Sequence, residues 1–177
     1  MSLSAKAKKI KAIFLDVDGV LTDGRMGYDN SGNEIKFYHT RDGHGIKLAM
    51  RSGLIVGILS GRECEANRRR AKELGLTFCR EKCHDKGIGF KELVQEYNLA
   101  YDECMYIGDD VIDIPPMRLA GISVAVADCD ELVAEVADLI TERRGGFGAV
   151  REAINWLLKE QGTYTEQVID KYLKSEL

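Results

Sequence analysis

The sequence predicts an α/β fold: a Rossmann-like, doubly wound parallel sheet with a projecting β-hairpin and no cap domain. Two observations support this. Short apolar, β-branched segments alternate with segments of helical periodicity along most of the chain, which is typical of βαβ units. The stretch 24–41 interrupts this alternation with a turn-rich sequence that has no helical pattern. Right-handed crossovers would place helices on both faces of the sheet.

The elements follow in a regular order along the chain. The expected strands are 11–15, 54–59, 77–79, 104–107, 122–126 and 138–140. The expected helices are 43–51, 64–74, 86–97, 112–120, 130–136 and 147–160. Within 24–41, the cluster DNSGN at 29–33 predicts the turn of a hairpin. The segment 163–177 is expected to be a C-terminal helix or tail, and 1–177 to form a single domain.

Composition narrows the class of protein. The chain has 45% hydrophobic and 31% charged residues and a net charge of −4, so we expect a cytoplasmic globular protein with no nucleic-acid partner. No apolar run approaches the length that spans a bilayer, and no membrane partner is expected. The five cysteines lack paired spacing, which favours reduced thiols over a zinc site.

Two aspartates with one residue between them, Asp16 and Asp18, end the first apolar strand. Such a pair is not specific alone, because Asp128 and Asp130 repeat it, and there Asp130 is better interpreted as a helix N-cap. Polar residues at the ends of other predicted elements indicate that Asp16 and Asp18 belong to a ligand-binding site. Ser60 follows the strand 54–59, Asp109 comes soon after 104–107, and Lys86 begins a helix. Ligands of open parallel sheets bind where the carboxyl ends of the strands meet.

The acids at this edge require a counter-charge. Asp16, Asp18, Asp109, Asp110 and Asp113 could share one pocket, and two like charges ~4 Å apart repel by roughly 4 kcal/mol at an effective dielectric constant of about 20. Either some carboxyl groups stay protonated or a cation lies among them. A hard divalent ion with oxygen ligands, Mg²⁺, fits this donor set.

These motifs resemble the haloacid dehalogenase-like phosphatases. The residues that carry the resemblance are DVDGVLT with Asp16 and Asp18, Ser60, Lys86, and GDDVID, which contains Asp109. The resemblance implies an aspartyl-phosphate mechanism, with Asp16 as nucleophile and Asp18 as acid and base. It further implies that Ser60 and Lys86 hold the phosphoryl group, and that Asp16, the carbonyl of Asp18 and Asp109 hold Mg²⁺.

In this family, the acids that follow Asp109 are expected to have a supporting role. Asp110 and Asp113 would orient Lys86 or a water molecule rather than react. Asp42 is expected to cap the helix 43–51, and Asp23 to open the hairpin.

A narrower resemblance is to the capless 3-deoxy-D-manno-octulosonate 8-phosphate phosphatases of lipopolysaccharide synthesis. It rests on DVDGVLTDG, HTRDGHGIK, SGR, GDDVIDIP and RRGGFGAVRE. It implies a phosphorylated sugar acid as substrate and a homotetramer in which neighbouring subunits cover the site, with the hairpin at the interface. Further substrate-binding candidates are Gly61, Arg62, Arg70 and, less directly, Arg41.

Other interpretations remain open. A phosphatase for a nine-carbon sugar-acid 9-phosphate is similar, although Arg62 favours the eight-carbon substrate. A non-catalytic interaction module of the same fold is a further alternative. A receiver-type signalling domain would carry its acidic pair first and its lysine last, whereas here the motif GDD follows Lys86.

Overall fold

A computed structural model describes residues 1–174, and its centre is a six-stranded sheet in the order β5-β4-β1-β6-β7-β8. Every pairing in this sheet is parallel, so the predicted fold class is confirmed. The six strands are β1 (Ala12–Leu15), β4 (Ile55–Leu59), β5 (Phe78–Arg80), β6 (Cys104–Gly108), β7 (Ile122–Ala125) and β8 (Leu139–Ile140).

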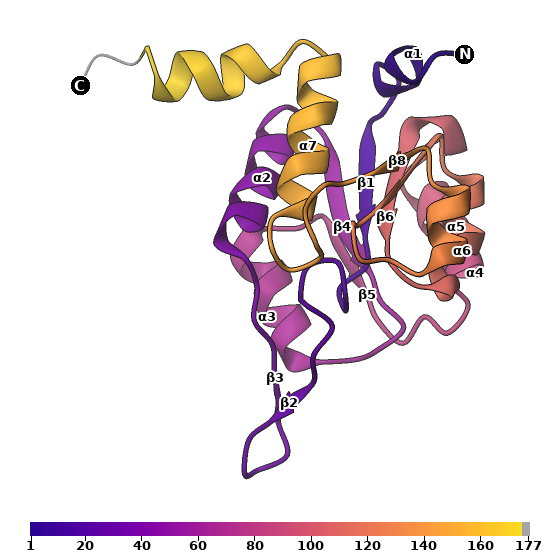
Figure 1. Ribbon diagram of the computed structural model, residues 1–177, viewed down its shortest axis with the longest axis vertical. Helices are drawn as coiled ribbons and strands as arrows, with labels where there is room; N and C mark the ends of the chain where they lie inside the picture. The colour runs from indigo at the N-terminus through magenta and orange to yellow at the C-terminus, as the bar shows by residue number, and fades with distance from the viewer. Residues whose placement is uncertain (175–177) are drawn as a thin grey trace.

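Helices cover both faces of the sheet (Figure 1). On one face lie α2 (Thr40–Arg51), α3 (Glu65–Leu74) and α7 (Ala149–Glu160), and on the other lie α4 (Lys86–Glu96), α5 (Ile114–Leu119) and α6 (Glu131–Val136). A short α1 (Leu3–Ala7) precedes β1, and a π-helix at Thr165–Asp170 follows α7. Among the described residues, no helix is both long and apolar enough to cross a bilayer.

The strand β1 demonstrates why the core has two halves. All four of its residues are buried. Ile13 and Leu15 pack into the cluster beneath α2 and α7, and Phe14 packs against Phe90 of α4 with ring centroids 4.7 Å apart. Side chains alternate between the faces of a strand, so a strand covered on both sides must be apolar throughout.

The structure differs from the sequence-based expectations at some element boundaries. The helix α1 was not predicted, and α5 begins at Ile114 rather than 112. A 3-10 turn, Val111–Asp113, occupies the start of that predicted helix. Pro115 and Pro116 then lie in the first turn of α5, where the missing N–H groups cost no hydrogen bond.

The capping role expected for Asp42 was wrong. Asp42 lies inside the first turn of α2, and its carboxylate accepts N–H bonds from Gly148 (3.2 Å) and Arg151 (2.7 Å). It therefore caps α7 rather than its own helix. The sequence could not reveal this contact, because the two helices meet only in the tertiary structure.

A hairpin of β2 (Gly27–Tyr28) and β3 (Glu34–Ile35) is the only insertion between β1 and α2 in the described chain. The Asp29 side chain closes its turn by accepting N–H bonds from Ser31 and Asn33. The hairpin projects from the end of the molecule opposite α1 and the helix Thr165–Asp170 (Figure 1).

Candidate active site

Strand register brings the predicted site residues to one edge of the sheet. Leu15 of β1 pairs with Ile58 of β4 on one side and with Ile107 of β6 on the other. The residues that follow these strands therefore share the carboxyl edge, and the Asp16 N–H donates to the Ile107 carbonyl at 3.1 Å. This is the position where parallel sheets bind ligands.

Lys86, the first residue of α4, is the centre of a buried charge cluster. Its side chain is fully buried, and its Nζ lies 2.8 Å from Asp16 Oδ1 and 2.7 Å from Asp113 Oδ1. Asp113 also accepts a bond from the Tyr106 hydroxyl at 2.8 Å. Its other oxygen accepts the N–H of Asp109 at 3.1 Å. Asp113 is thus saturated with donors, which suits a group that fixes Lys86.

The two remaining carboxyl groups of this cluster have strongly perturbed acidity. Burial, together with the charge of Asp113, raises the pKa of Asp16 to about 7, although Lys86 opposes the shift. Burial and the charges of Asp16 and Asp113 raise the pKa of Asp109 to about 8. Burial lowers the pKa of Lys86, but its two acid partners outweigh burial and the net shift is upward. One lysine does not neutralise three acids, so the cluster retains an excess of negative charge.

The arrangement fits a divalent cation. Oxygens of Asp16, Asp109 and Asp113 lie within 4.8 Å of one another, and Asp109 Oδ1 is buried without a hydrogen-bond partner. Gly19, at φ +88°, leaves space for Asp109, since a Cβ at this position would overlap its Oδ2. An unpartnered buried carboxylate oxygen and an all-oxygen donor set are what Mg²⁺ requires.

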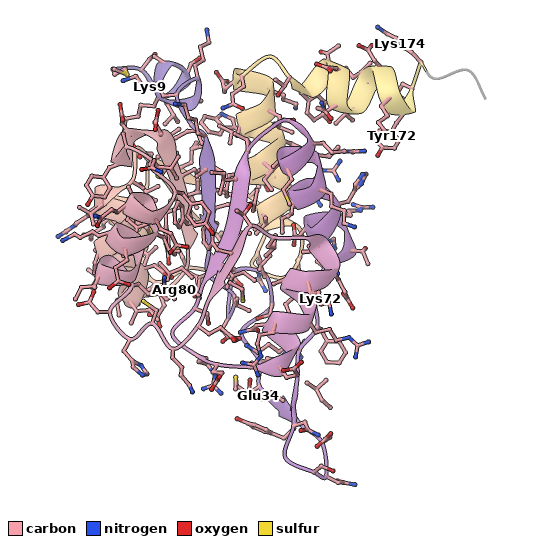
Figure 2. All side chains as sticks on the ribbon, turned by 180° about the vertical axis from the view of Figure 1, so that it is seen from behind. Lys9, Glu34, Lys72, Arg80, Tyr172 and Lys174 are labelled. Carbon is pink, nitrogen blue, oxygen red and sulfur yellow. The ribbon has the colours of Figure 1, made fainter. Side chains whose placement is uncertain are left out.

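Asp18 belongs to a second group of charges, at the base of the hairpin. Its Oδ1 lies 2.6 Å from Lys36 Nζ, and its Oδ2 lies 3.9 Å from Arg62 Nε. Arg62 also pairs with Glu34 of β3. Figure 2 places Glu34 where the hairpin leaves the body of the molecule. Lys36 and Glu34 were not predicted, because charged residues in a polar hairpin carry no signal of their own.

The other predicted site residues have different surroundings. Ser60, directly after β4, is buried, and its hydroxyl accepts the Arg62 N–H at 3.3 Å. The Asp110 carboxylate accepts the Val111 N–H and caps the 3-10 turn, so it does not reach Lys86. Arg70 stacks over the Tyr38 ring, 5.5 Å from its centroid.

Two further candidates complete the set of predicted residues. A Cβ placed on Gly61 would lie 3.6 Å from the Cys83 carbonyl oxygen. Arg41 lines a groove of about 810 Å³ with residues of α2, α7 and the loop before α7, including Arg143 and Arg151. Arg41 thus lies in a separate hollow from the Lys86 cluster.

Comparison with known proteins agrees with this geometry. Residues 78–154 match the family model of the haloacid dehalogenase-like hydrolases. This segment contains Lys86, Asp109 and Asp113. The fold is that of the haloacid dehalogenase-like class of hydrolases.

Individual relatives identify a narrower family within this class of hydrolases. The chain is 42% identical to the 3-deoxy-D-manno-octulosonate 8-phosphate phosphatase KdsC of Escherichia coli K12, over 92% of this chain and 86% of that protein. A crystal structure of the corresponding phosphatase from Moraxella catarrhalis, with magnesium, phosphate and KDO bound, is 36% identical. It has a TM-score of 0.92, over 95% of this chain and 97% of that one. A probable YrbI family phosphatase from Pseudomonas syringae is 40% identical, with a TM-score of 0.94 and 98% of both chains covered. This chain belongs to the haloacid dehalogenase-like family of 3-deoxy-D-manno-octulosonate 8-phosphate phosphatases.

Proposed function

We propose that this protein is a Mg²⁺-dependent phosphomonoesterase that hydrolyses 3-deoxy-D-manno-octulosonate 8-phosphate through an aspartyl-phosphate. The observation that carries the proposal is the buried contact of Asp16 with Lys86, beside the unpartnered oxygen of Asp109. A carboxylate nucleophile needs its charge screened before it can approach a phosphate dianion, and this cluster provides the cation of Lys86 and donors for a second one.

In the first step, a carboxylate oxygen of Asp16 attacks the phosphorus and the bond to the sugar oxygen breaks. Asp18 gives a proton to that oxygen, so the sugar acid leaves as an alcohol. The product on the enzyme is an acyl phosphate on Asp16. The backbone places both carboxyl groups at the end of β1, with Val17 between them.

In the second step, Asp18 takes a proton from water while the water oxygen attacks the phosphorus. The bond between phosphorus and Asp16 breaks, which releases inorganic phosphate and restores both carboxyl groups. Each step thus uses Asp18 once, first as an acid and then as a base.

Binding of the phosphoryl oxygens is assigned to Lys86 and Ser60. Lys86 is already fixed by Asp113 at 2.7 Å, so it needs no reorientation when substrate binds. Gly61, Arg62 and Arg70 are assigned to the rest of the substrate. A guanidinium fork suits the carboxylate of a sugar acid, and Arg62 lies 3.9 Å from Asp18.

Asp16, Asp109 and the backbone carbonyl of Asp18 would hold Mg²⁺, which, when bound, neutralises charge on the phosphoryl oxygens and aligns them for attack. Asp113 is assigned to Lys86 instead, because its oxygens already accept bonds from Lys86, Tyr106 and backbone N–H groups. Asp110 is assigned to the turn that presents Asp109.

The proposal extends to assembly and biological context. The hairpin exposes apolar side chains, which suits the subunit interface of a homotetramer that covers the site in place of a cap. These exposed side chains are Met26, Tyr28, Ile35 and Phe37. A monomer found by light scattering at micromolar concentration would contradict the homotetramer.

The proposal also covers the biological context. We place the protein in the cytoplasm, in lipopolysaccharide biosynthesis, as a single domain spanning 1–177.

The decisive experiment measures inorganic phosphate released by wild type and by Asp16→Asn, with Mg²⁺ and then with chelator. Eight-carbon and nine-carbon sugar-acid phosphates are compared by kcat/KM. We expect turnover that requires Mg²⁺ and Asp16 and favours the eight-carbon substrate. No turnover of any phosphosugar would point to the non-catalytic interaction module, and a preference for the nine-carbon acid would replace the substrate.

A further inference from the structure

Lys36 is a buried cation beside the candidate active site. It lies directly after β3, and its side chain is only 2% exposed. Its Nζ is 2.6 Å from Asp18 Oδ1. Lysine is almost never fully buried without a partner, and removal of one member of such a pair leaves the other charge uncompensated. The contact is therefore a built feature of the site.

The surroundings of Lys36 fix its position. Glu34 Oε2 lies 4.0 Å from Lys36 Nζ, and Glu34 also pairs with Arg62. Arg62 in turn approaches the other oxygen of Asp18. Two acids and two cations thus alternate in a closed ring, and three of the four members lie outside the turn that carries Asp18.

The two oxygens of Asp18 have unequal surroundings. Oδ1 accepts a hydrogen bond from Lys36 at 2.6 Å, whereas Arg62 Nε approaches Oδ2 only to 3.9 Å. Fixing one oxygen determines where the other points, because the carboxylate is planar. A proton carrier must face the sugar oxygen first and a water molecule afterwards, and small errors in this geometry cost large factors in rate.

We propose that Lys36 is a positioning residue that holds the Asp18 carboxylate, through Oδ1, in the orientation for proton transfer. This inference rests on the proposed function, in which Asp18 carries the proton. It makes the acid–base step depend on the hairpin, because Lys36 follows the hairpin strand β3 and Glu34 lies within it.

The test is a double-mutant cycle of Lys36→Met and Asp18→Asn, measured as kcat/KM on 3-deoxy-D-manno-octulosonate 8-phosphate at high enzyme concentration. We expect Lys36→Met to lower kcat/KM about 10–100-fold in wild type, mainly through kcat. In the Asp18→Asn background it should change kcat/KM by less than about 3-fold, because residues that act through each other are not additive. Lys36→Arg keeps the charge and should restore part of the loss.

A second readout separates positioning from simple charge. The value of kcat/KM reports the steps up to transfer of the phosphoryl group to the enzyme. An aryl leaving group departs without a proton in this transfer, whereas the sugar alcohol needs one. Lys36→Met should therefore lower kcat/KM much less for an aryl phosphate than for the sugar phosphate. Lys82→Met is the matched control, because Lys82 is 66% exposed and pairs with Glu63 outside the ring. It should leave both rates unchanged.

Several outcomes would overturn the proposal. They are equal losses in both backgrounds of the cycle, an effect confined to KM, or equal losses on both leaving groups. If Lys36→Met does not fold, as judged by circular dichroism, Lys36→Arg provides the same cycle, and a rate equal to wild type then refutes the inference. Failure of the proposed function is distinguished by wild type itself, which would then not turn over the sugar phosphate.

Discussion

The candidate site has two halves that are built on different principles. The strand-end cluster of Asp16, Lys86 and Asp113 is buried, with side chains no more than 6% exposed. The hairpin ring is more open on one side, since the side chains of Asp18 and Arg62 are 23% and 48% exposed although that of Lys36 is only 2% exposed. Charges in the cluster interact strongly and cannot be solvated, whereas water screens the charge of Arg62.

Because of this difference in burial, the two halves should affect different measurable quantities. A change in the cluster should alter folding stability and catalysis together, because each charge there depends on a buried partner. A change at the exposed member of the ring, Arg62, should alter catalysis or substrate binding while folding stability stays nearly constant.

Lys86→Met should have the largest effect. It leaves Asp16 and Asp113 without their shared cation, so the free energy of unfolding should fall by about 3–5 kcal/mol and kcat by at least about 100-fold. Urea denaturation and phosphate release measure the two quantities. Lys91→Met is the control, because Lys91 is an exposed residue of the same helix. Unchanged stability in Lys86→Met would show that the cluster is not a unit.

Gly19→Ala should have the next largest effect on stability and Mg²⁺ binding, and Gly53→Ala is its control for backbone strain. Both glycines have φ +88°, so both alanine variants should lose about 1–2 kcal/mol through the left-handed backbone. Only the Cβ at position 19 meets Asp109, whereas nothing lies within 4 Å of the Cβ at position 53. We therefore expect Gly19→Ala alone to weaken Mg²⁺ binding, by about 10-fold or more. A magnesium titration of activity checks this, and equal affinities would contradict it.

The pH dependence of stability tests the acidic cluster directly. The pKa values of Asp16 and Asp109, about 7 and about 8, lie above the ordinary value of 3.8. The folded protein then binds these protons more tightly than the unfolded chain, so its stability falls as the pH rises from about 4 to 8. Mg²⁺ binds the ionised carboxylates, and its stabilising effect should be larger at pH 8 than at pH 6. Differential scanning fluorimetry measures the change in Tm, and equal Mg²⁺-induced shifts at both pH values would be inconsistent with the cluster as a cation site.

Arg62→Met should have the smallest effect on the fold. The ion pairs of Arg62 are partly exposed, so we expect the free energy of unfolding to change by less than about 1 kcal/mol. Its effect should be a KM for the sugar acid raised about 10-fold, with kcat much less affected. Arg25→Met, at an 84% exposed side chain paired with Asp23, is the control for loss of a hairpin charge. A large loss of stability in Arg62→Met would abolish the contrast between the two halves.

Much of the strand-end half could be predicted from the sequence. Alternating or continuous apolar runs in the sequence locate β1, β4 and β6. The polar residues that follow these strands must gather at one edge when the strands are parallel. Asp16, Ser60 and Asp109 directly follow β1, β4 and β6, as the apolar runs predict. Tyr106 was not predicted as a contact of this cluster, because a tyrosine within an apolar strand is indistinguishable from a core residue.

The hairpin half could not be predicted in the same way. Its strands are only two residues long, which is too short for any periodic signal, so the sequence indicated a hairpin without its register or direction. Lys36 and Asp18 are 18 residues apart, and their contact depends on how the hairpin folds back over the sheet edge.

Periodicity along the chain was sufficient to predict the alternation of strands and helices and the edge at which the acids collect. Like-charge repulsion between those acids was sufficient to predict a cation among them. The specific ion pairs and caps became visible only in the folded molecule. Of the two acids expected to orient Lys86, Asp113 pairs with it and Asp110 caps a 3-10 turn instead. Asp18 pairs with Lys36, and Asp42 caps a helix 106 residues away. Such pairings depend on distances across the fold of a few ångströms, and no local pattern in the chain encodes them.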